Sequence, residues 1–377
     1  ETVLGHSPRP VVEALRKQVE NGTHFGVVNE QQVELGRKAV ELVPCAEMIR
    51  FCCSGTEATM YATRLARGFT RRRVVLKIEG GWHGGNPALH RAVTSPYDRP
   101  ESLGILEGET LYTGSIQLND LEGARKAIRE FSSDLAMVLV EPLMGSGCIP
   151  SEVDFLKGLR EETEKIGALL VFDEVITGFR LSLGGGQQFY GVKPDLCTLG
   201  KILGGGLHMG AVCGRRDIMS LADPTRKVPK NEKVWMGGGT YSGNPLAMVA
   251  GLATLNTLSE GRDEIYPRLN NLTDKARREI DATFDKEGIP TLTTGKGSLL
   301  VTHFLKKPGL TVRNAGEKAR NTDTELQFLY YLGMMVSHNI FFLPEHTGAI
   351  STAHTSADID TMLEATELFA NRLKASL

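Results

Sequence analysis

The stretch TLGKILGGGLHMG, residues 198–210, places one lysine, Lys201, in a run that is otherwise apolar and rich in glycine. Burial of an ammonium group in such surroundings is costly unless the lysine has a partner or reacts covalently. A lysine that forms a Schiff base reacts as the neutral amine, which an apolar environment favours. The alternative is a lysine whose stem lies along apolar surface while its charge reaches solvent. The residues upstream decide between the two.

Residues 168–174, ALLVFDE, form a continuous apolar run that ends in two acids, Asp173 and Glu174. This pattern indicates a buried parallel strand with carboxylates at its C-terminal end. Open α/β sheets bind their ligands at that edge. An aspartate there is suited to hold the protonated ring nitrogen of pyridoxal 5'-phosphate (PLP), while Lys201 on a later loop forms the Schiff base. An ordinary buried ion pair is the competing explanation.

A phosphate site is predicted where the stretch that begins at Met48 runs into Ser54, Gly55 and Thr56 and then into a helix. Backbone N–H groups, two hydroxyl groups and the positive end of a helix would converge there. This arrangement suits a phosphate monoester. Alone the signal is weak, because a serine at a helix start is usually just an N-cap.

Together these residues resemble the class III aminotransferases of the fold-type-I PLP enzymes. The more specific resemblance is to the branch that holds glutamate-1-semialdehyde aminomutases and β-amino-acid aminotransferases. It spans nearly the whole chain, and it is more specific for cofactor and fold than for substrate. The matching stretches are residues 22–26 (GTHFG), 53–58 (CSGTEA), 81–84 (GWHG), 140–142 (VEP), 172–175 (FDEV), 199–201 (LGK) and 239–245 (GTYSGNP).

The resemblance implies roles around the cofactor ring. Lys201 and Asp173 are the expected catalytic residues. Trp82 takes the position that stacks on the pyridine ring, His83 supports it, and Val175 packs on the opposite face. The less specific interpretation of Trp82 is an aromatic side chain that covers a strand end, but its flanking glycines match the spacing of the family.

The resemblance also implies how the phosphate is held. Ser54, Gly55 and Thr56 are its expected ligands, and Thr240 is expected to reach the phosphate of the other subunit. This predicts a homodimer with shared active sites. Glu141 is expected to support the ring through a neighbouring side chain or water, although a cap on the following loop explains it almost as well.

Strands and helices alternate, which predicts an α/β fold of the fold-type-I PLP-dependent transferases: a mostly parallel sheet flanked by helices, plus a smaller α+β C-terminal domain. We expect an N-terminal segment (1–28) that packs with the small domain, a large PLP-binding domain (29–260) and a small domain (261–377). Apolar periodicity predicts helices over residues 8–20, 31–42, 60–68, 121–131, 152–166, 264–286 and 322–338, and strands over 74–78, 136–140, 168–174, 195–199, 211–214 and 298–302.

Composition excludes several function classes. The chain has 377 residues, of which 41% are hydrophobic, and a net charge of -2 that gives no electrostatic case for nucleic acid or anionic membrane as partners. The six cysteines lack metal-ligand spacing, so we expect reduced core residues of a cytoplasmic protein and no metal. No signal peptide or membrane span is expected. Because the chain starts with Glu1, we expect that an N-terminal segment of the site is missing.

The predicted reaction moves an amino group through a Lys201 Schiff base from an amino acid or amine, with a β-amino acid as one candidate, to a 2-oxo acid. The alternative is glutamate-1-semialdehyde 2,1-aminomutase, and a third hypothesis is a catalytically silent binding subunit. Three departures favour the aminotransferase: residues 86–113 form a different lid, residues 143–147 lack the aminomutase asparagine, and Gly348 replaces its glutamate. Glu345 stands where β-phenylalanine aminotransferases often carry arginine, which leaves the donor open.

Overall fold

The computed structural model describes residues 2–237, 239–343 and 346–376, and the chain divides into two compact units. Unit 1 comprises Glu1–Pro142 and Ser151–Arg262, and unit 2 comprises Leu143–Pro150 and Asp263–Leu377. The small unit therefore begins close to the expected boundary, but it also contains a segment that the sequence analysis assigned to the large domain. The N-terminal region, residues 1–28, groups with unit 1.

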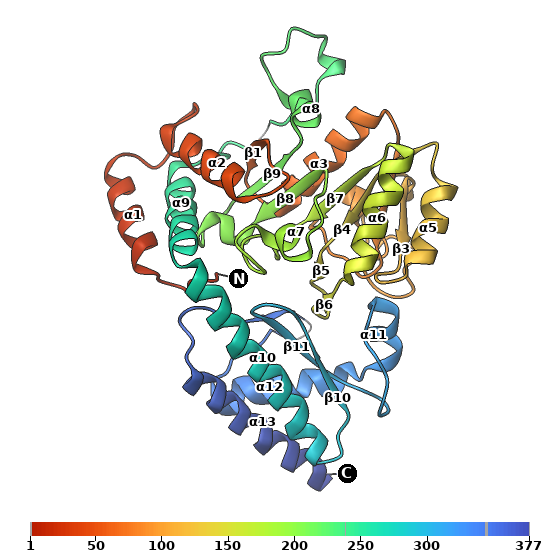
Figure 1. Cartoon of the computed structure of the whole chain (residues 1–377), viewed down its shortest axis with the longest axis vertical. Helices are drawn as coiled ribbons and strands as arrows, with labels where there is room; N and C mark the ends of the chain where they lie inside the picture. Colours follow the sequence, from red (N-terminus) through yellow and green to blue (C-terminus); the bar gives the residue numbers. More distant parts are fainter. Residues whose placement is uncertain (1, 238, 344–345, 377) are drawn as a thin grey trace. The chain divides into compact units, whose positions relative to one another are not determined.

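Unit 1 contains a seven-stranded sheet in the order β1-β9-β8-β7-β4-β2-β3 (Figure 1). Its strands are β1 (Met48–Cys52), β2 (Val74–Ile78), β3 (Thr113–Ile116), β4 (Leu135–Val140), β7 (Leu169–Asp173), β8 (Leu196–Gly200) and β9 (Gly210–Gly214). The pairs from β8 to β3 are parallel, whereas β9 is antiparallel to both β8 and β1. The sheet is thus mostly parallel, as predicted, with one reversed strand.

Helices cover both faces of this sheet. Helix α3 contacts β8 and β9, helix α6 contacts β7 and β4, and Figure 1 shows the two on opposite sides of the strands. Helix α1 lies against α9, which explains why the N-terminal region belongs to unit 1. The helices of unit 1 are α1 (Arg9–Glu20), α2 (Glu30–Leu42), α3 (Gly55–Thr70), α4 (Glu107–Thr110), α5 (Leu121–Glu130), α6 (Val153–Ile166), α7 (Gly185–Tyr190), α8 (Arg216–Met219) and α9 (Pro245–Glu260).

Local sequence explains where these elements begin and end. Strands β4 and β7 are fully buried because the sheet is covered on both faces, which their continuous apolar runs predict. Helix α3 begins after Ser54, whose side chain accepts from the backbone N–H of Glu57. Helix α6 ends at Gly167 in the left-handed region (φ 68°), which glycine adopts without strain. The sequence thus sets the start of α3 with a capping serine and the end of α6 with a left-handed glycine.

Unit 2 has its own small sheet and core. The sheet has the order β10-β11-β12 and is antiparallel throughout. A short separate hairpin joins β5 and β6. The core of unit 2 includes Phe284, Phe304 and Tyr330, whose rings pack edge to face. Its elements are β5 (Leu143–Met144), β6 (Ile149–Pro150), α10 (Arg262–Lys286), β10 (Thr291–Thr294), β11 (Leu299–Phe304), α11 (Ala315–Asn321), α12 (Thr324–His338), β12 (Gly348–Ala349) and α13 (Ser356–Ser376).

Some helices and strands of the structure were not predicted from the sequence. Strand β3, at one edge of the main sheet, begins at the last residue of the predicted loop 86–113 and continues into residues for which no element was predicted. Helix α13, the long final helix of unit 2, was not predicted either. The predicted loop 86–113 contains the short helix α4 and a bridge between Arg91 and Pro100. Among the described residues, none of the helices is both long and apolar enough to cross a membrane. Pro344 and Glu345 lie outside the described residues.

Candidate active site

Five strands of unit 1 end at the same edge of the sheet. Strands β2, β4, β7 and β8 are parallel, and β1 runs in the same direction because it is antiparallel to β9, which is antiparallel to β8. Their C-terminal ends deliver Trp82, Glu141, Asp173, Lys201 and Ser54. The strand register therefore brings together side chains that are far apart in the sequence.

A cavity of about 360 Å³ opens at this edge. Its volume lies in the range of about 300–1,000 Å³ that is usual for small-molecule sites. Eight of the predicted site residues line it: Ser54, Gly55, Thr56, Trp82, Glu141, Asp173, Val175 and Lys201. The other lining residues, which sequence reasoning did not select, are Cys53, Gly84, Ile176, Leu207, His208 and Met209.

Lys201 stands at the start of the 3-10 helix Lys201–Gly204 with a φ of 44°. A residue with a β-carbon rarely adopts this left-handed conformation, and such strain is concentrated at functional sites. The preceding Gly200 is fully extended, and a β-carbon there would touch Val175. The chain thus turns sharply at the point where the lysine side chain enters the cavity.

Asp173 is the centre of a buried polar network. Its Oδ2 lies 2.7 Å from His83 Nδ1, and its Oδ1 accepts from Thr198 Oγ1 at 2.8 Å and from the Val175 N–H at 3.2 Å. Thr198 is the register partner of Asp173 on the neighbouring strand. Sequence reasoning missed Thr198, because the register of two neighbouring strands has no local sequence signal. The carboxylate is consequently held in one orientation at the cavity wall.

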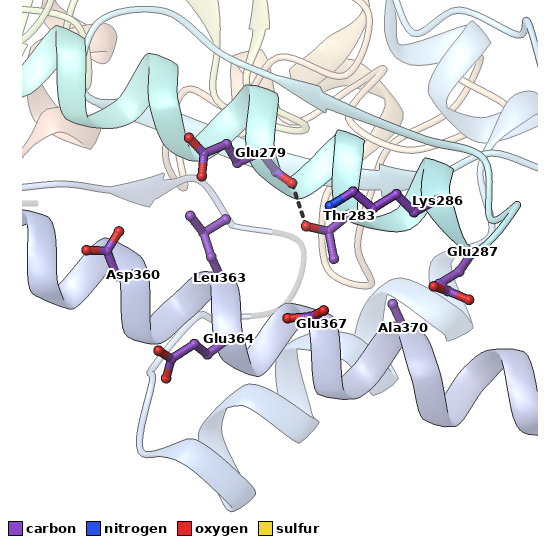
Figure 2. Close-up of a pocket in the computed structure, with 9 residues that line it drawn as sticks. All are labelled: Glu279, Thr283, Lys286, Glu287, Asp360, Leu363, Glu364, Glu367 and Ala370. Carbon is purple, nitrogen blue, oxygen red and sulfur yellow. Dashed lines mark hydrogen bonds between the residues drawn. The ribbon is translucent and has the colours of Figure 1, made fainter.

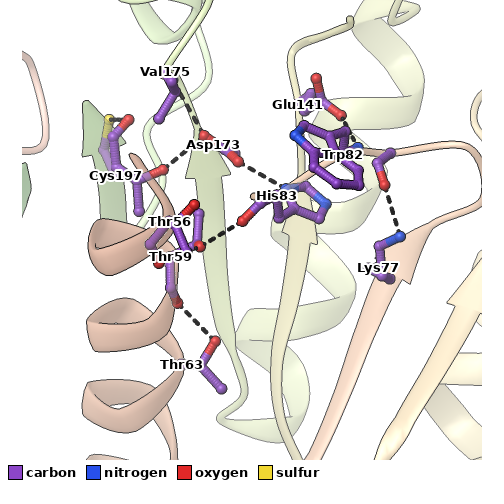
Figure 3. A network of polar contacts seen from close by, with 12 residues as sticks. Thr56, Thr59, Thr63, Lys77, Trp82, His83, Glu141, Asp173, Val175 and Cys197 are labelled. Carbon is purple, nitrogen blue, oxygen red and sulfur yellow. Dashed lines mark hydrogen bonds and ion pairs between the residues drawn. The ribbon is translucent and has the colours of Figure 1, made fainter. Parts of the chain in front are cut away.

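His83 does not line the cavity but contacts Asp173, which does (Figure 3). Burial lowers the pKa of His83, and the neighbouring Asp173 opposes this shift. A neutral imidazole beside a carboxylate carries its proton on the nitrogen that faces it, so Nδ1–H donates to Asp173. The His83 carbonyl accepts from Thr59 Oγ1 at 2.7 Å, which ties the histidine to helix α3.

The N-terminus of α3 forms one end of the cavity, where Ser54, Gly55 and Thr56 line it. The backbone N–H groups of a first helical turn have no partner within the helix, and they carry the positive end of its dipole. Ser54 and Thr56 add hydroxyl groups there. Thr56 Oγ1 also accepts from the Gly85 N–H at 3.2 Å, and a β-carbon at Gly84 would overlap that hydroxyl. This end is therefore a glycine-lined cradle that suits an anion such as a phosphate group.

Trp82 and Glu141 form the third wall. The Trp82 side chain is 52% exposed, and its ring packs edge to face with His90 at a centroid distance of 5.2 Å. Glu141 is buried, and its Oε1 accepts from the Trp82 N–H at 3.0 Å. Glu141 thus contacts the backbone of the aromatic residue at the cavity.

Thr240 is the one predicted site residue that neither lines the cavity nor joins the Asp173 network. It lies in the glycine-rich segment before α9, close to Tyr241, whose ring packs against His24 and His208. His208 lines the cavity. The role that the resemblance gives Thr240 belongs to a second subunit and stays a prediction.

Glu174, the acid after Asp173, has a different use. It accepts from the backbone N–H groups of Gly186 and Gln187, from the Gln187 amide and from the Thr177 hydroxyl. Burial raises the pKa of Glu174. The carboxylate closes the segment after β7 into a fixed loop behind Asp173 instead of facing the cavity.

A second hollow, of about 290 Å³, lies between α10 and α13 in unit 2 (Figure 2). Its charged lining is mainly acidic: Glu279, Glu287, Asp360, Glu364 and Glu367, with Lys286 as the cation. Asp360 forms an ion pair with Lys275 at 2.6 Å. This groove has the character of a solvated helix surface and not of a built site.

Three thiols come together in the core, which their sequence spacing did not indicate. The Sγ atoms of Cys45, Cys197 and Cys213 all lie within 4.8 Å of one another, and all three residues are buried. All six cysteines are free thiols. Cys197 Sγ donates to the Thr198 carbonyl at 3.6 Å and Cys213 Sγ donates to the Cys197 carbonyl at 3.7 Å, so this cluster is explained as buried core thiols that bond to the backbone.

The donor set at the cavity fits PLP. A lysine, a fixed carboxylate, an aromatic ring and an anion cradle that contains two glycines surround one space. In PLP, the lysine would meet the aldehyde carbon, the carboxylate the ring nitrogen, the aromatic side chain the ring face and the cradle the phosphate group.

Comparison with known proteins agrees with this arrangement. A family model described as aminotransferase class-III matches residues 1–322. The glutamate-1-semialdehyde 2,1-aminomutase 2 of Bacillus velezensis is 41% identical over 371 residues, which cover 97% of this chain and 83% of that protein. An omega-transaminase from Sphaerobacter thermophilus has a TM-score of 0.87 at 30% identity, with 98% of this chain and 84% of that chain covered. A beta-phenylalanine aminotransferase from Variovorax paradoxus has a TM-score of 0.86 at 34% identity, with 99% and 81% covered.

Proposed function

Because the chain belongs to the class III aminotransferase family, with the fold of fold-type-I PLP-dependent transferases, we propose that it moves an amino group at the cavity of unit 1. It is an enzyme of this class, so the hypothesis of a catalytically silent binding subunit is set aside. Its cofactor is PLP. When bound, PLP holds the substrate nitrogen and withdraws electrons from the carbon that carries it.

The roles of the residues follow from their positions. Lys201 Nζ takes the proton from the substrate carbon next to nitrogen and later returns it. Asp173 keeps a proton on the ring nitrogen, because Thr198 and His83 hold its carboxylate in place. The observation that carries the proposal is that Lys201, in a strained backbone conformation, and the fixed Asp173 line one cavity.

The phosphate is bound by the α3 N-terminus in this proposal. The hydroxyls of Ser54 and Thr56 and the N–H of Gly55 supply the donors, and the helix dipole adds to the binding. Trp82 and Val175 both line the cavity, and in this proposal they would pack on the two faces of the ring. These contacts fix the substrate carbon relative to Lys201, which is the main contribution of the protein to the rate.

The reaction we propose first is the 2,1-amino shift of glutamate-1-semialdehyde. The relative from Bacillus velezensis carries this activity in its name, so the comparisons favour the alternative of the sequence analysis over its main prediction. The shift moves nitrogen from C2 to C1 and gives 5-amino-4-oxopentanoate without any second substrate. A site that retains its bound intermediate throughout is sufficient for this chemistry.

The second candidate is transfer between two molecules, from an amino acid to a 2-oxo acid. Two observations favour it: the solved structures at 30% and 34% identity are an omega-transaminase and a beta-phenylalanine aminotransferase, and Gly348 stands where aminomutases carry glutamate. Glu345, which also bears on this choice, lies outside the described residues.

The two candidates are separated by the need for an acceptor. Purified protein saturated with PLP is incubated with glutamate-1-semialdehyde alone, and separately with β-phenylalanine with or without a 2-oxo acid. Formation of 5-amino-4-oxopentanoate in the first reaction supports the aminomutase. Product that requires the 2-oxo acid supports the aminotransferase. Lys201→Ala is the control, and turnover that survives this substitution contradicts the role of Lys201.

We further propose a cytoplasmic homodimer. Thr240 then reaches the phosphate of the second subunit, and the six free thiols suit a reducing compartment. Thr240→Val is expected to weaken PLP binding without a change in dimer mass, as measured by PLP titration and light scattering. Unchanged PLP affinity would contradict the shared site.

A further inference from the structure

Lys77 is a charged residue at a fully buried position. It lies on β2 between the buried apolar residues Leu76 and Ile78, and its side chain has no exposed surface. An apolar side chain would fill this place without the cost of removing an ammonium group from water. The charge therefore indicates a specific use.

The ammonium group of Lys77 binds two backbone carbonyl groups of the segment that carries Trp82. Lys77 Nζ donates to the carbonyl oxygen of Gly81 at 2.8 Å and to that of Arg91 at 2.9 Å. Gly81 directly precedes Trp82. Lys77 thus connects the two ends of the segment 81–91, which carries Trp82.

Glu141 binds the other side of the same peptide group. It follows β4, the strand beside β2, and its Oε1 accepts from the Trp82 N–H at 3.0 Å. The peptide between Gly81 and Trp82 therefore has its carbonyl on a cation and its N–H on an anion, as Figure 3 shows. Both bonds are charge-assisted, which makes them stronger than bonds between neutral groups.

Rotation of this peptide group would swing the Trp82 side chain. Two consecutive glycines, Gly80 and Gly81, precede Trp82, and Gly80 has a φ of 80°. Glycine can adopt many backbone conformations, so the sequence of this turn does not by itself fix the orientation of the peptide group. The orientation of the peptide is then set by its hydrogen bonds. His83, the next residue along, contacts Asp173, so the same turn also positions the support of that carboxylate.

We propose that Lys77 and Glu141 are a positioning pair, which fixes the Gly81–Trp82 peptide group and through it the Trp82 ring at the cofactor cavity. This inference rests on the proposed function. Neither residue performs a chemical step in it: the pair acts on the geometry of Trp82. Strand β2 supplies the positive charge of Lys77, and the neighbouring strand β4 leads to the negative charge of Glu141. Both charges bind the turn that carries Trp82.

The chain offers a direct reporter, because it contains two tryptophans, Trp82 and Trp235. In a Trp235→Phe background, the emission comes from Trp82 alone, and bound PLP quenches it according to distance and orientation. We expect Lys77→Met to reduce the fraction of emission that saturating PLP quenches and to lower turnover about ten- to a hundredfold. Thr163→Val is the matched control, since it removes a buried hydroxyl from α6 in the same unit and should leave quenching unchanged.

A pair of Glu141 variants gives a second measurement that does not depend on the folding of Lys77→Met. Glu141→Gln retains an oxygen acceptor for the Trp82 N–H, so quenching should stay near that of the parent. Glu141→Met removes the acceptor, so quenching should fall. Equal quenching in Glu141→Gln and Glu141→Met, or parental quenching in Lys77→Met, overturns the positioning pair while the proposed function stands. A Trp235→Phe parent that binds no PLP overturns the proposed function and this inference with it.

Discussion

The substitution Asp173→Asn tests the centre of the site, because it removes a charge while it keeps the shape. The asparagine oxygen can still accept from Thr198 and from the Val175 N–H, where the carboxylate oxygen now lies at 2.8 and 3.2 Å. The amide would instead face His83 Nδ1 and force that nitrogen to accept. The proton then moves to Nε2, which is buried and has no hydrogen-bond partner among the described residues.

The magnitudes follow from these contacts. Nε2 has no partner in the parent either, so the main change is that the charge-assisted bond between His83 and Asp173 becomes a bond between neutral groups, and the free energy of unfolding of the cofactor-free protein should fall by about 1 kcal/mol. The bond from the ring nitrogen to a charged acceptor contributes about 1.5–3 kcal/mol. Since about 1.36 kcal/mol corresponds to a factor of ten, PLP affinity should fall roughly 10- to 150-fold. Turnover should fall as well, because a neutral amide does not keep the ring nitrogen protonated.

The assay is a PLP titration followed by visible absorbance, together with urea unfolding of the cofactor-free protein. Asp195→Asn is the matched control: Asp195 is as buried as Asp173, with 4% exposure each, but it binds Arg160 and Arg215 away from the cavity. It should lose stability and keep its PLP affinity. If Asp173→Asn binds PLP within about threefold of the parent and turns over at a similar rate, the assigned role is refuted.

Two further predictions concern stability near the cavity. Gly84→Ala introduces a β-carbon against Thr56 Oγ1 at a φ of 78°, so it should cost about 1–3 kcal/mol and weaken PLP binding, whereas Gly85→Ala, where the space is open, should do neither in the same titrations. Burial lowers the pKa of Lys77 to about 8 from 10.5. Between these pH values the unfolded chain binds the additional proton, so stability should rise with pH across that window by up to about 3 kcal/mol and be flat below it. Urea unfolding at pH 7.5 and 10 should show this rise in the parent relative to Lys77→Met, and parallel pH profiles would contradict it.

Hydrophobic patterning and the order of motifs along the chain were enough to predict the fold class and most residues of the cavity. Continuous apolar runs before Asp173 and Glu141 predicted buried parallel strands, because a sheet covered on both faces has no polar side. Strands of this kind end at a common edge, so acids and a lysine at their ends had to converge. Lys201, Asp173 and the phosphate residues Ser54, Gly55 and Thr56 were found from such local patterns. The site roles of Trp82, Glu141 and Val175 followed from the resemblance to the class III aminotransferases, and all eight residues line the cavity. Glycine-rich motifs such as residues 81–84 were recognisable from local order alone.

The contacts between individual side chains could be known only from the folded structure. The hydrogen bond from Thr198 to Asp173 depends on the register of β7 and β8. The contacts of Lys77 and Glu141 with one peptide group depend on β2 and β4 being neighbours in the sheet. Neither relation has a local sequence signal, since hydrophobic periodicity gives the face of a strand but not its partner. Likewise, the packing of α1 on α9 and the clustering of three thiols arise from long-range contacts. Spacing along the chain cannot encode such contacts, because they are set by the whole packed core.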